Sequence, residues 1–479
     1  FNRDKRMKNF LLGAVLSFFV ASSFADDANE LLRYVDQHGE KFDRLALELW
    51  DYAELGYLES RSSTKLQQVL ADDGFEIQVG VAGIPTAFIA SFGEGKPVIG
   101  ILAEFDALPG ISQAAVPSRQ LLEGKESGHA CGHHLFGAGS TAAAMAVRHW
   151  MENNNVKGTV RLYGTPAEEG GSGKVYLVRA GLFEDVDTVL HWHPSDRNSA
   201  NAETSLANKS ARFKFRGISA HAAAAPERGR SALDGVEAMN FMVNMMREHV
   251  PQETRIHYVI TQGGEAPNVV PDFAEVYYYV RHPQAEKLNE LWQRVINISR
   301  AAALGTGTDV DVEVMHGNRS LLPNEKLSRL MHANLTQVGG VSYNAEEQAF
   351  AEKISGSLGV GNFVGTEKEI LPFELRQGMG STDVGDVSWV VPTVGLRTST
   401  WVPGTAAHSW QAIAAGGTSI GTKGMRVAAK ALSLTARDLF LNPQLVEAGR
   451  IEFELRRGAN FRYKSLLGNR EPPLDYRLK

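Results

Sequence analysis

The sequence predicts an α/β protein in which a mostly parallel sheet with helices on both faces is interrupted by an inserted α+β domain. Three observations support this fold class. Strand-like and helical segments alternate over the first half of the chain, the pattern changes near residue 207, and the chain has 479 residues. Because a chain of this length exceeds what one hydrophobic core usually serves, we expect two domains.

The first domain opens with apolar residues at helical spacing, at 29–55 and again at 63–72. Between the strands that follow, the stretch 135–151 has the small residues of a helix that packs closely on a sheet. The strands themselves are predicted where short apolar runs are bounded by Gly or Pro, at 87–92, 98–102, 159–163 and 188–190. Strands that alternate with helices imply a mostly parallel sheet.

The inserted domain is recognised by alternating strands such as ARFKFRG, RIHYVIT and FAEVYYYVR, with helical stretches at 231–249 and 286–304. The order strand, helix, strand, strand, helix, strand is that of a ferredoxin-like α+β sandwich. Beyond residue 445 the chain is charged and poorly periodic, and we expect it on the surface. The predicted boundaries place the catalytic domain in two segments at 26–207 and 319–445, the inserted domain between them at 208–318, and a C-terminal tail at 446–479.

Residues 7–25 have the pattern of a signal peptide, with a basic start, a short apolar run, and the small residues Ser23 and Ala25 at the cleavage positions. This predicts a periplasmic or secreted protein. No later segment offers about 18 uninterrupted apolar residues, so we expect no membrane association after cleavage. The formal net charge of −6 gives no electrostatic reason to expect nucleic acid as a partner.

The densest group of reactive side chains is the motif GHACGHH at 128–134. Cys131 is the single cysteine of the chain, and a lone thiol outside the cytoplasm is open to oxidation unless a metal ligates it. Cys131 and His133 lie two residues apart at a helix start, and a thiolate with an imidazole suits zinc. The alternative is a helix-capping loop whose histidines are merely exposed, which so dense a cluster makes the weaker interpretation.

Three further motifs follow predicted strands or occupy loops. In TPAEEGGSGK, Glu169 could bind a metal while Glu168 holds a water molecule or takes its proton, although such pairs are usually solvated surface charge. In DTVLHWHPSD, we expect only one of His191 and His193 to face a site. His408 in GTAAHSWQ is a lone loop histidine that gains weight only from the other motifs. Ligands bind where such strand ends meet.

Four more residues are candidates for supporting roles. Asp106 follows a predicted strand and could orient a metal ligand, or it could simply form a turn. In the inserted domain, His221 and Arg281 follow strands and Asn268 lies in a loop. The planar fork of Arg281 suits a substrate carboxylate, whereas the ordinary alternative is a surface ion pair.

These residues lie in motifs through which the sequence resembles the metallopeptidase family of aminoacylases, glutamate carboxypeptidases and hydrolases of indoleacetyl and hippuryl amino acids. The likeness runs from about residue 31 to 440. In many relatives an Asp stands at the position of His134. The motifs are GKPVIGILAEFDALPG, GHACGHH, EEGGSGK, WHPSD, AHAAAAPERGRSALD, PNVVPD, GSTDVGDVSW and AHSWQ.

The resemblance implies a catalytic domain that holds two divalent metal ions, zinc or manganese, and an inserted domain that mediates dimerisation. It implies Cys131 as the ligand that bridges the two ions. The family's ligand histidine lies six residues after an Asp, here Asp187, which selects His193 over His191. The implied remaining ligands are His133, Glu169, His193 and His408.

The resemblance also implies the roles of the other candidates. Glu168 is expected to be the general base that activates a water molecule between the two ions. His221 is expected to reach the partner subunit's site and stabilise the oxyanion, with Asp106 in the catalytic machinery. Asn268 and Arg281 are expected to bind the substrate carboxylate. The partner would be a second copy or a related chain.

The predicted activity is hydrolysis of the amide bond of an N-acyl amino acid. A dipeptidase or carboxypeptidase with the same metal site is the first alternative. An exported binding protein without catalysis is the second, and the intact set of ligands and base argues against it.

Overall fold

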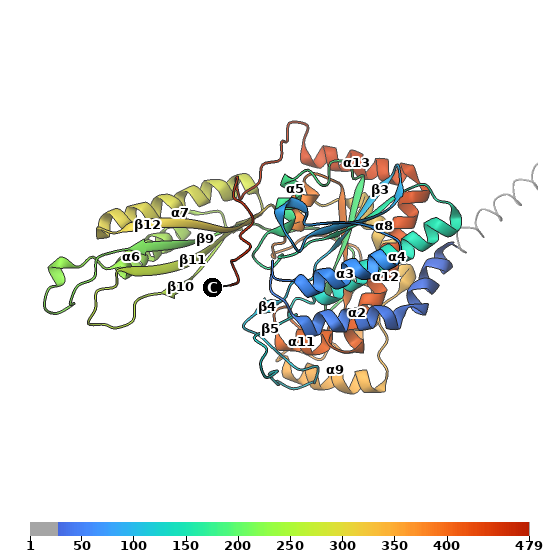
Figure 1. Ribbon diagram of the computed structural model, residues 1–479, viewed down its shortest axis with the longest axis horizontal. Helices are drawn as coiled ribbons and strands as arrows, with labels where there is room; N and C mark the ends of the chain where they lie inside the picture. The colour runs from blue at the N-terminus through green and yellow to red at the C-terminus, as the bar shows by residue number, and fades with distance from the viewer. Residues whose placement is uncertain (1–26, 479) are drawn as a thin grey trace, which may run out of the picture.

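The computed structural model describes residues 27–478, so the expected signal peptide at 7–25 lies outside the described residues. The chain forms a larger lobe and a smaller elongated lobe (Figure 1). The smaller lobe is formed by one continuous segment between residues 207 and 318, and the chain before and after this segment forms the larger lobe. Within the described residues, no helix combines the length and the apolar character that a membrane crossing requires.

The larger lobe contains a six-stranded sheet in the order β1-β2-β6-β3-β7-β14. The last four of these are mutually parallel, whereas β1 and β2 run antiparallel at one edge. This confirms the predicted mostly parallel sheet. Strand β3 is buried along its whole length, which explains its unbroken apolar sequence VIGILA. The bounds are β1 (Glu76–Val79), β2 (Phe88–Glu94), β3 (Val98–Ala103), β6 (Gly158–Gly164), β7 (Thr188–Ser195) and β14 (Thr393–Ser399).

Two long helices, α4 (His133–Asn154) and α12 (Ser419–Leu441), pack together against one face of this sheet. The small residues of α4 allow the approach, since a Cβ atom on Gly139 would lie 2.8 Å from the ring of Trp192. The short helix α5 lies on the opposite side of the sheet from α4, as right-handed crossovers require, and α10 packs against α5 (Figure 1). A helix over residues 27–37 precedes α2. The remaining helices and short strands are α2 (Gly39–Tyr52), α3 (Ser60–Asp72), α5 (Gly173–Arg179), α8 (Glu325–Val338), α9 (Ala345–Ser357), α10 (Val384–Ser388), α11 (Trp410–Gly416), β4 (Leu108–Pro109), β5 (Ser127–Gly128), β8 (Ala202–Thr204) and β13 (Leu375–Gln377).

The smaller lobe has its own antiparallel sheet in the order β10-β11-β9-β12, with α6 and α7 packed on it. The element order and the sheet order are those of a ferredoxin-like sandwich, as predicted. The lobe has a separate core in which Phe213 contacts both Tyr278 and Trp292. The bounds are β9 (Ala207–Arg216), α6 (Ala232–Met246), β10 (Arg255–Gln262), β11 (Phe273–His282), α7 (Ala285–Thr306) and β12 (Asp309–Asn318).

The last stretch of the described chain differs from the expectation of a surface tail. It begins with helix α13 (Pro443–Arg457) and continues as residues 458–478, which we call the crossing segment. The crossing segment, dark red in Figure 1, leaves α13 and runs over the junction between the two lobes. Leu466 is buried in the core of the smaller lobe, and Leu467 is buried in that of the larger lobe. The crossing segment therefore joins both cores.

Candidate metal centre

The candidate site lies where the parallel strands of the larger lobe end. Glu104 and Asp106 follow β3, and Glu168 and Glu169 follow β6. The loop after β14 carries His408 beside them. Since the carboxyl ends of parallel strands meet at one edge, side chains from distant positions in the sequence converge there.

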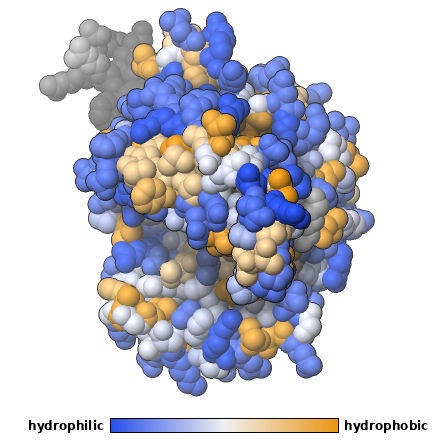
Figure 2. Space-filling view, turned by 90° about the vertical axis from the view of Figure 1, so that its left-hand side faces the viewer, coloured by the Kyte–Doolittle hydropathy of each residue, from blue (hydrophilic) through white to orange (hydrophobic). Residues whose placement is uncertain are grey.

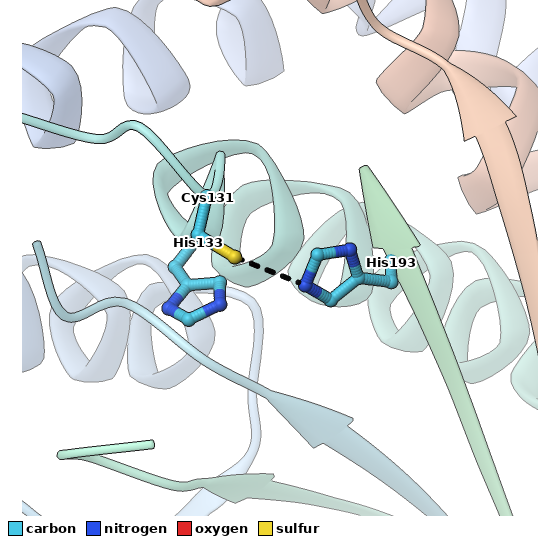
Figure 3. Close-up of side chains that lie close together, drawn as sticks. All are labelled: Cys131, His133 and His193. Atoms are coloured by element: carbon cyan, nitrogen blue, oxygen red, sulfur yellow. Dashed lines mark hydrogen bonds between the residues drawn. The ribbon is translucent and has the colours of Figure 1, made fainter. Parts of the chain in front are cut away.

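A first group of donor atoms is formed by Cys131, His133 and His193, whose potential ligand atoms all lie within 4.8 Å of one another (Figure 3). The Sγ atom of Cys131 is 3.4 Å from Nε2 of His193. The turn between Cys131 and His133 requires glycine, because Gly132 has a φ of +77° and an added Cβ would meet Pro194 at 2.7 Å. This left-handed residue starts α4 and lets both side chains face the same point.

A second group is formed by Cys131, Glu169 and His408, again within 4.8 Å. The Nε2 atom of His408 lies 3.1 Å from Oε1 of Glu169. The loop that carries His408 is tied to the Cys131 loop, since the backbone N–H of His408 donates to the carbonyl of Ala130 at 2.9 Å. Cys131 belongs to both groups, as a bridging thiolate between two ions would.

The electrostatics of the site fit bound cations. Contacts with Cys131 and Glu169 raise the pKa of His408 to about 11. Burial alone would lower the pKa of His133, but the charges of Cys131, Glu104 and Asp106 outweigh it and raise the pKa. Protons on these histidines offset a surplus of buried negative charge that divalent ions would neutralise, and thiolate, imidazole and carboxylate are suitable donors. The donor set therefore fits two divalent metal ions.

Asp106 holds two of the candidate ligands at once. One carboxylate oxygen lies 2.9 Å from Nδ1 of His133, and the other accepts the backbone N–H of Glu169 at 2.8 Å. Asp106 is 1% exposed. A carboxylate on the far nitrogen of a ligating histidine fixes its tautomer and ring orientation, so the orienting interpretation suits Asp106 better than a simple turn.

Sequence reasoning missed a buried charge network behind the donors. The ammonium group of Lys174 lies 2.7 Å from a carboxylate oxygen of Glu104 and 2.7 Å from one of Asp383, and all three residues are buried. Lys174 belongs to EEGGSGK and Asp383 to GSTDVGDVSW, but neither motif reveals burial. The other oxygen of Glu104 lies 3.1 Å from Nε2 of His133, which links the network to the donors.

His134 belongs to neither donor group. Its Nε2 atom lies 3.0 Å from the backbone carbonyl of Gly416, and the ring is buried. Burial lowers the pKa of His134, so the ring is neutral. It connects the start of α4 to the end of α11.

A cavity of about 330 Å³ opens beside the donors, within the size range of small-molecule sites. Both His191 and His193 line it, so the expectation that only one would face the site is wrong. Residues i and i+2 of a strand share a face, and β7 extends through both histidines. His193 contacts Cys131, whereas the ring of His191 lies against Gly395. The two histidines therefore share a face of β7 but differ in position along it: His193 lies beside the donor Cys131, and His191 lies two residues earlier in the strand.

Arg281 reaches the same cavity from the smaller lobe, on β11. One of its nitrogens is 3.5 Å from the hydroxyl of Ser381, and among the described residues it makes no ion pair. This excludes the alternative of an ordinary surface ion pair. Tyr279 and His316 line the cavity beside it, and burial lowers the pKa of His316 to about 4. The cation of Arg281 is thus available to a bound carboxylate.

His221 and Asn268, in contrast, are not brought to the cavity of their own chain. Both are exposed, and neither belongs to the cavity lining. They lie together, since the N–H of Ala222 donates to the carbonyl of Asn268 and His221 pairs with Val269. The Nδ1 atom of His221 accepts from the backbone of the residues that follow it. Their predicted roles require a second chain.

Known proteins are similar to this chain in sequence, and one of its domains matches a known domain family. Residues 207–306 match the model of a peptidase dimerisation domain. The chain is 40% identical over 452 residues to the B subunit of p-aminobenzoyl-glutamate hydrolase from Escherichia coli (strain K12), an alignment that covers 88% of this chain and 93% of that protein. It is 31% identical over 442 residues to Xaa-Arg dipeptidase of Mus musculus, with 88% and 91% covered. These relatives are enzymes, which argues against the non-catalytic alternative.

Solved structures show the same fold. A dinuclear metal-binding peptidase of the M20 family from Bacillus subtilis superposes with a TM-score of 0.54 at 19% identity, covering 83% of this chain and 98% of that one. An aminobenzoyl-glutamate utilization protein from Klebsiella pneumoniae superposes with a TM-score of 0.56 at 18% identity, covering 84% of this chain and 97% of that one. With the donor groups in place and relatives aligned over most of its length, the chain belongs to the M20 family of metal-dependent peptidases and amidohydrolases.

Proposed function

We propose that the protein hydrolyses the amide bond of N-acyl amino acids and favours p-aminobenzoyl-glutamate-like substrates. One observation carries this proposal: Cys131, which the two donor groups share, lines one cavity together with members of both groups, the carboxylate of Glu168 and the guanidinium of Arg281. The relative named as the B subunit of p-aminobenzoyl-glutamate hydrolase supports the choice of substrate.

In the proposed mechanism, Glu168 carries the proton of the reaction. Burial and the neighbouring carboxylates of Glu104 and Glu169 raise the pKa of Glu168. A carboxylate of raised pKa can take a proton from a water molecule and return it to the leaving amine. Divalent cations at this centre would supply Lewis acidity and acidify that water. Thiolate and imidazole favour zinc, while the carboxylates also suit manganese.

Arg281 is placed to orient the substrate. A free carboxylate on the amino acid would receive two parallel hydrogen bonds from its fork, fixing the scissile carbonyl relative to Glu168. Asn268 and His221 would join from the partner, with His221 at the oxyanion. Amino acids with a blocked carboxylate should therefore be poor substrates.

A dipeptidase activity is the second candidate, and one feature of the cavity favours it. The carboxylate of Glu203 lines the cavity, 3.6 Å from the guanidinium of Arg397. A cationic side chain on the substrate could displace Arg397 from Glu203. The relative named as an Xaa-Arg dipeptidase is consistent with such a preference.

We further propose a dimer that forms through the smaller lobe, either with a second copy or with a related chain. Strand β10 is an edge strand on which Val259 and Ile260 are exposed, and Phe241 on α6 is 67% exposed. Figure 2 views the molecule from this end and shows hydrophobic patches within a mostly hydrophilic surface. An unpaired strand edge with apolar side chains is a natural pairing surface. We place the protein in the periplasm or outside the cell, on the pattern at 7–25.

The test is hydrolysis by the mature protein, loaded with zinc or manganese, of p-aminobenzoyl-glutamate, its α-amide, and a Xaa-Arg dipeptide. We expect turnover of the first substrate that a chelator abolishes and added metal restores. Faster turnover of the dipeptide would favour the second candidate. No turnover of any of them, with metal bound, would contradict the proposal.

A further inference from the structure

The backbone of Glu169 is held from both sides, and one of the two holders is the crossing segment. On the amino side, the N–H of Glu169 donates to Asp106 at 2.8 Å. On the carboxyl side, the carbonyl of Glu169 accepts the hydroxyl of Tyr476 at 3.0 Å and a guanidinium nitrogen of Arg477 at 2.5 Å. Two peptide planes fixed on either side of one Cα fix the direction in which its side chain leaves the backbone.

We propose that Tyr476 and Arg477 are positioning residues of the metal centre, which hold the carboxylate of Glu169 in place beside Cys131 and His408. This inference rests on the proposed metal centre. It goes further, because it assigns a role to residues more than 300 positions away from Glu169 in the sequence.

The two residues are themselves anchored. The ring of Tyr476 packs edge-on against Tyr57, with centroids 5.6 Å apart, and Tyr57 donates to the carbonyl of Gly171 at 2.7 Å. Gly170, which follows Glu169 with a φ of +89°, lies against both Tyr476 and Arg477. The crossing segment thus covers part of the turn after Glu169.

The rest of the crossing segment is fixed to both lobes, so it can deliver Tyr476 and Arg477 reproducibly. Arg470 donates to the backbone carbonyls of Val314 and Met315 on β12, the second at 3.0 Å. Arg179 on α5 donates to the carbonyl of Arg470. Together with buried Leu466, these contacts hold the crossing segment at the lobe junction.

The second donor group alone contains Glu169, so loss of the two holders should weaken one of the two metal ions selectively. The double variant Tyr476→Phe with Arg477→Met keeps the ring and the aliphatic stem but removes both donors. Residues that support a metal ligand typically contribute 10- to 100-fold in metal affinity, so we expect one ion to bind about 10-fold or more weakly while the other is unchanged.

The measurement is a competition titration of the full chain with a chromophoric chelator, using zinc alone and no substrate. Arg477→Lys, which keeps a donor, should recover some of the loss. The matched control is Arg462→Met, because Arg462 is exposed and its side chain donates to the carbonyl of Phe461. Circular dichroism melting reports the folding of every variant, and Tyr476→Phe alone is the milder version if the double variant melts early.

The outcomes separate the two claims. A parent protein that binds two zinc ions, beside a double variant that binds both with parental affinity, would overturn the positioning role. A parent that binds no zinc would instead contradict the metal centre and the proposed function. Equal weakening of the binding of both ions, with a lowered melting temperature in the double variant and in Tyr476→Phe, would show a general packing role. That result would also overturn the inference.

Discussion

The sequence assigns catalytic residues to two regions, one in each lobe, and these two regions are built very differently. At the sheet edge of the larger lobe, Cys131, His193 and Glu169 come from separate loops and strands, yet the ligand atoms of His193 and of Glu169 each lie within 4.8 Å of that of Cys131. In the smaller lobe, His221 and Asn268 are exposed, do not line the cavity, and are hydrogen-bonded within their own loops. One chain therefore brings its candidate metal donors together but leaves these two predicted substrate-site residues apart from the cavity.

Arg281 marks the boundary between these two situations. It belongs to the smaller lobe but lies at the end of β11 near the lobe junction, where it reaches the cavity of its own chain. We propose that position within the smaller lobe decides which chain a residue serves. On this proposal, residues near the junction serve their own site, and residues far from it serve a partner's.

The largest effect is expected from removing Glu168, the proposed proton carrier in the cavity of the larger lobe. Glu168→Gln keeps the shape of the side chain but cannot take a proton. We expect the turnover number to fall by about 10²- to 10⁴-fold, with metal content unchanged, measured by steady-state kinetics and metal analysis. Unchanged turnover would show that Glu168 is not the base.

The next test concerns the far end of the smaller lobe. His221→Ala should lower turnover by about 10²- to 10³-fold through loss of oxyanion stabilisation. A mixture of His221→Ala and Glu168→Gln chains should regain activity, because one site of a mixed dimer combines an intact Glu168 with the intact histidine of the other chain. Two inactive variants that stay inactive after mixing and exchange of chains would place His221 outside the partner's site.

A substitution of Arg281 tests whether a residue at the junction between the lobes acts in the site of its own chain. Arg281→Met should raise KM for p-aminobenzoyl-glutamate by about 10- to 100-fold, since a charge-assisted hydrogen bond contributes about 1.5–3 kcal/mol. The α-amide of the same substrate provides the control, because it lacks the α-carboxylate and should respond little. Mixing with His221→Ala chains should not restore the parental KM at the sites that carry Met, as Arg281 acts in its own chain. An equal loss on both substrates would reject the carboxylate contact.

The smallest expected effect is at the dimer surface. Val259→Lys places a charge on the β10 edge, where Val259 is 56% exposed in the single chain, and should weaken association without changing the fold. Sedimentation at several concentrations should show more monomer than for the parent, with lower activity in dilute solution. A parental dissociation profile would move the interface away from β10.

Much of the fold follows from patterns along the sequence. The unbroken apolar run of β3 and the alternation in β9 and β11 predict the two sheets, because burial on both faces or on one face leaves these signatures. The donor residues were also accessible from the sequence, through GHACGHH and the motifs that accompany it. Burial and the exact extent of a strand were harder to predict. The error over His191 arose because β7 continues through both histidines, so that residues i and i+2 lie on the same face.

Other features leave no pattern that sequence reasoning can use. Lys174 is fully buried, although lysine is rarely so, and only tertiary structure reveals that Glu104 and Asp383 pair with it. Tyr476 and Arg477 lie in a charged segment that looks like an exposed tail. Their contact with Glu169 spans more than 300 residues, and no local periodicity encodes it.

Amide hydrolysis by this protein is proposed to depend on two metal ions bridged by Cys131. The zinc content and the rate of p-aminobenzoyl-glutamate hydrolysis should therefore be measured for the parent and for Cys131→Ala, with and without a chelator. We expect two zinc ions per chain and chelator-sensitive turnover for the parent, and loss of both in Cys131→Ala. Parental metal content and turnover in Cys131→Ala would show that Cys131 does not bridge a catalytic metal centre.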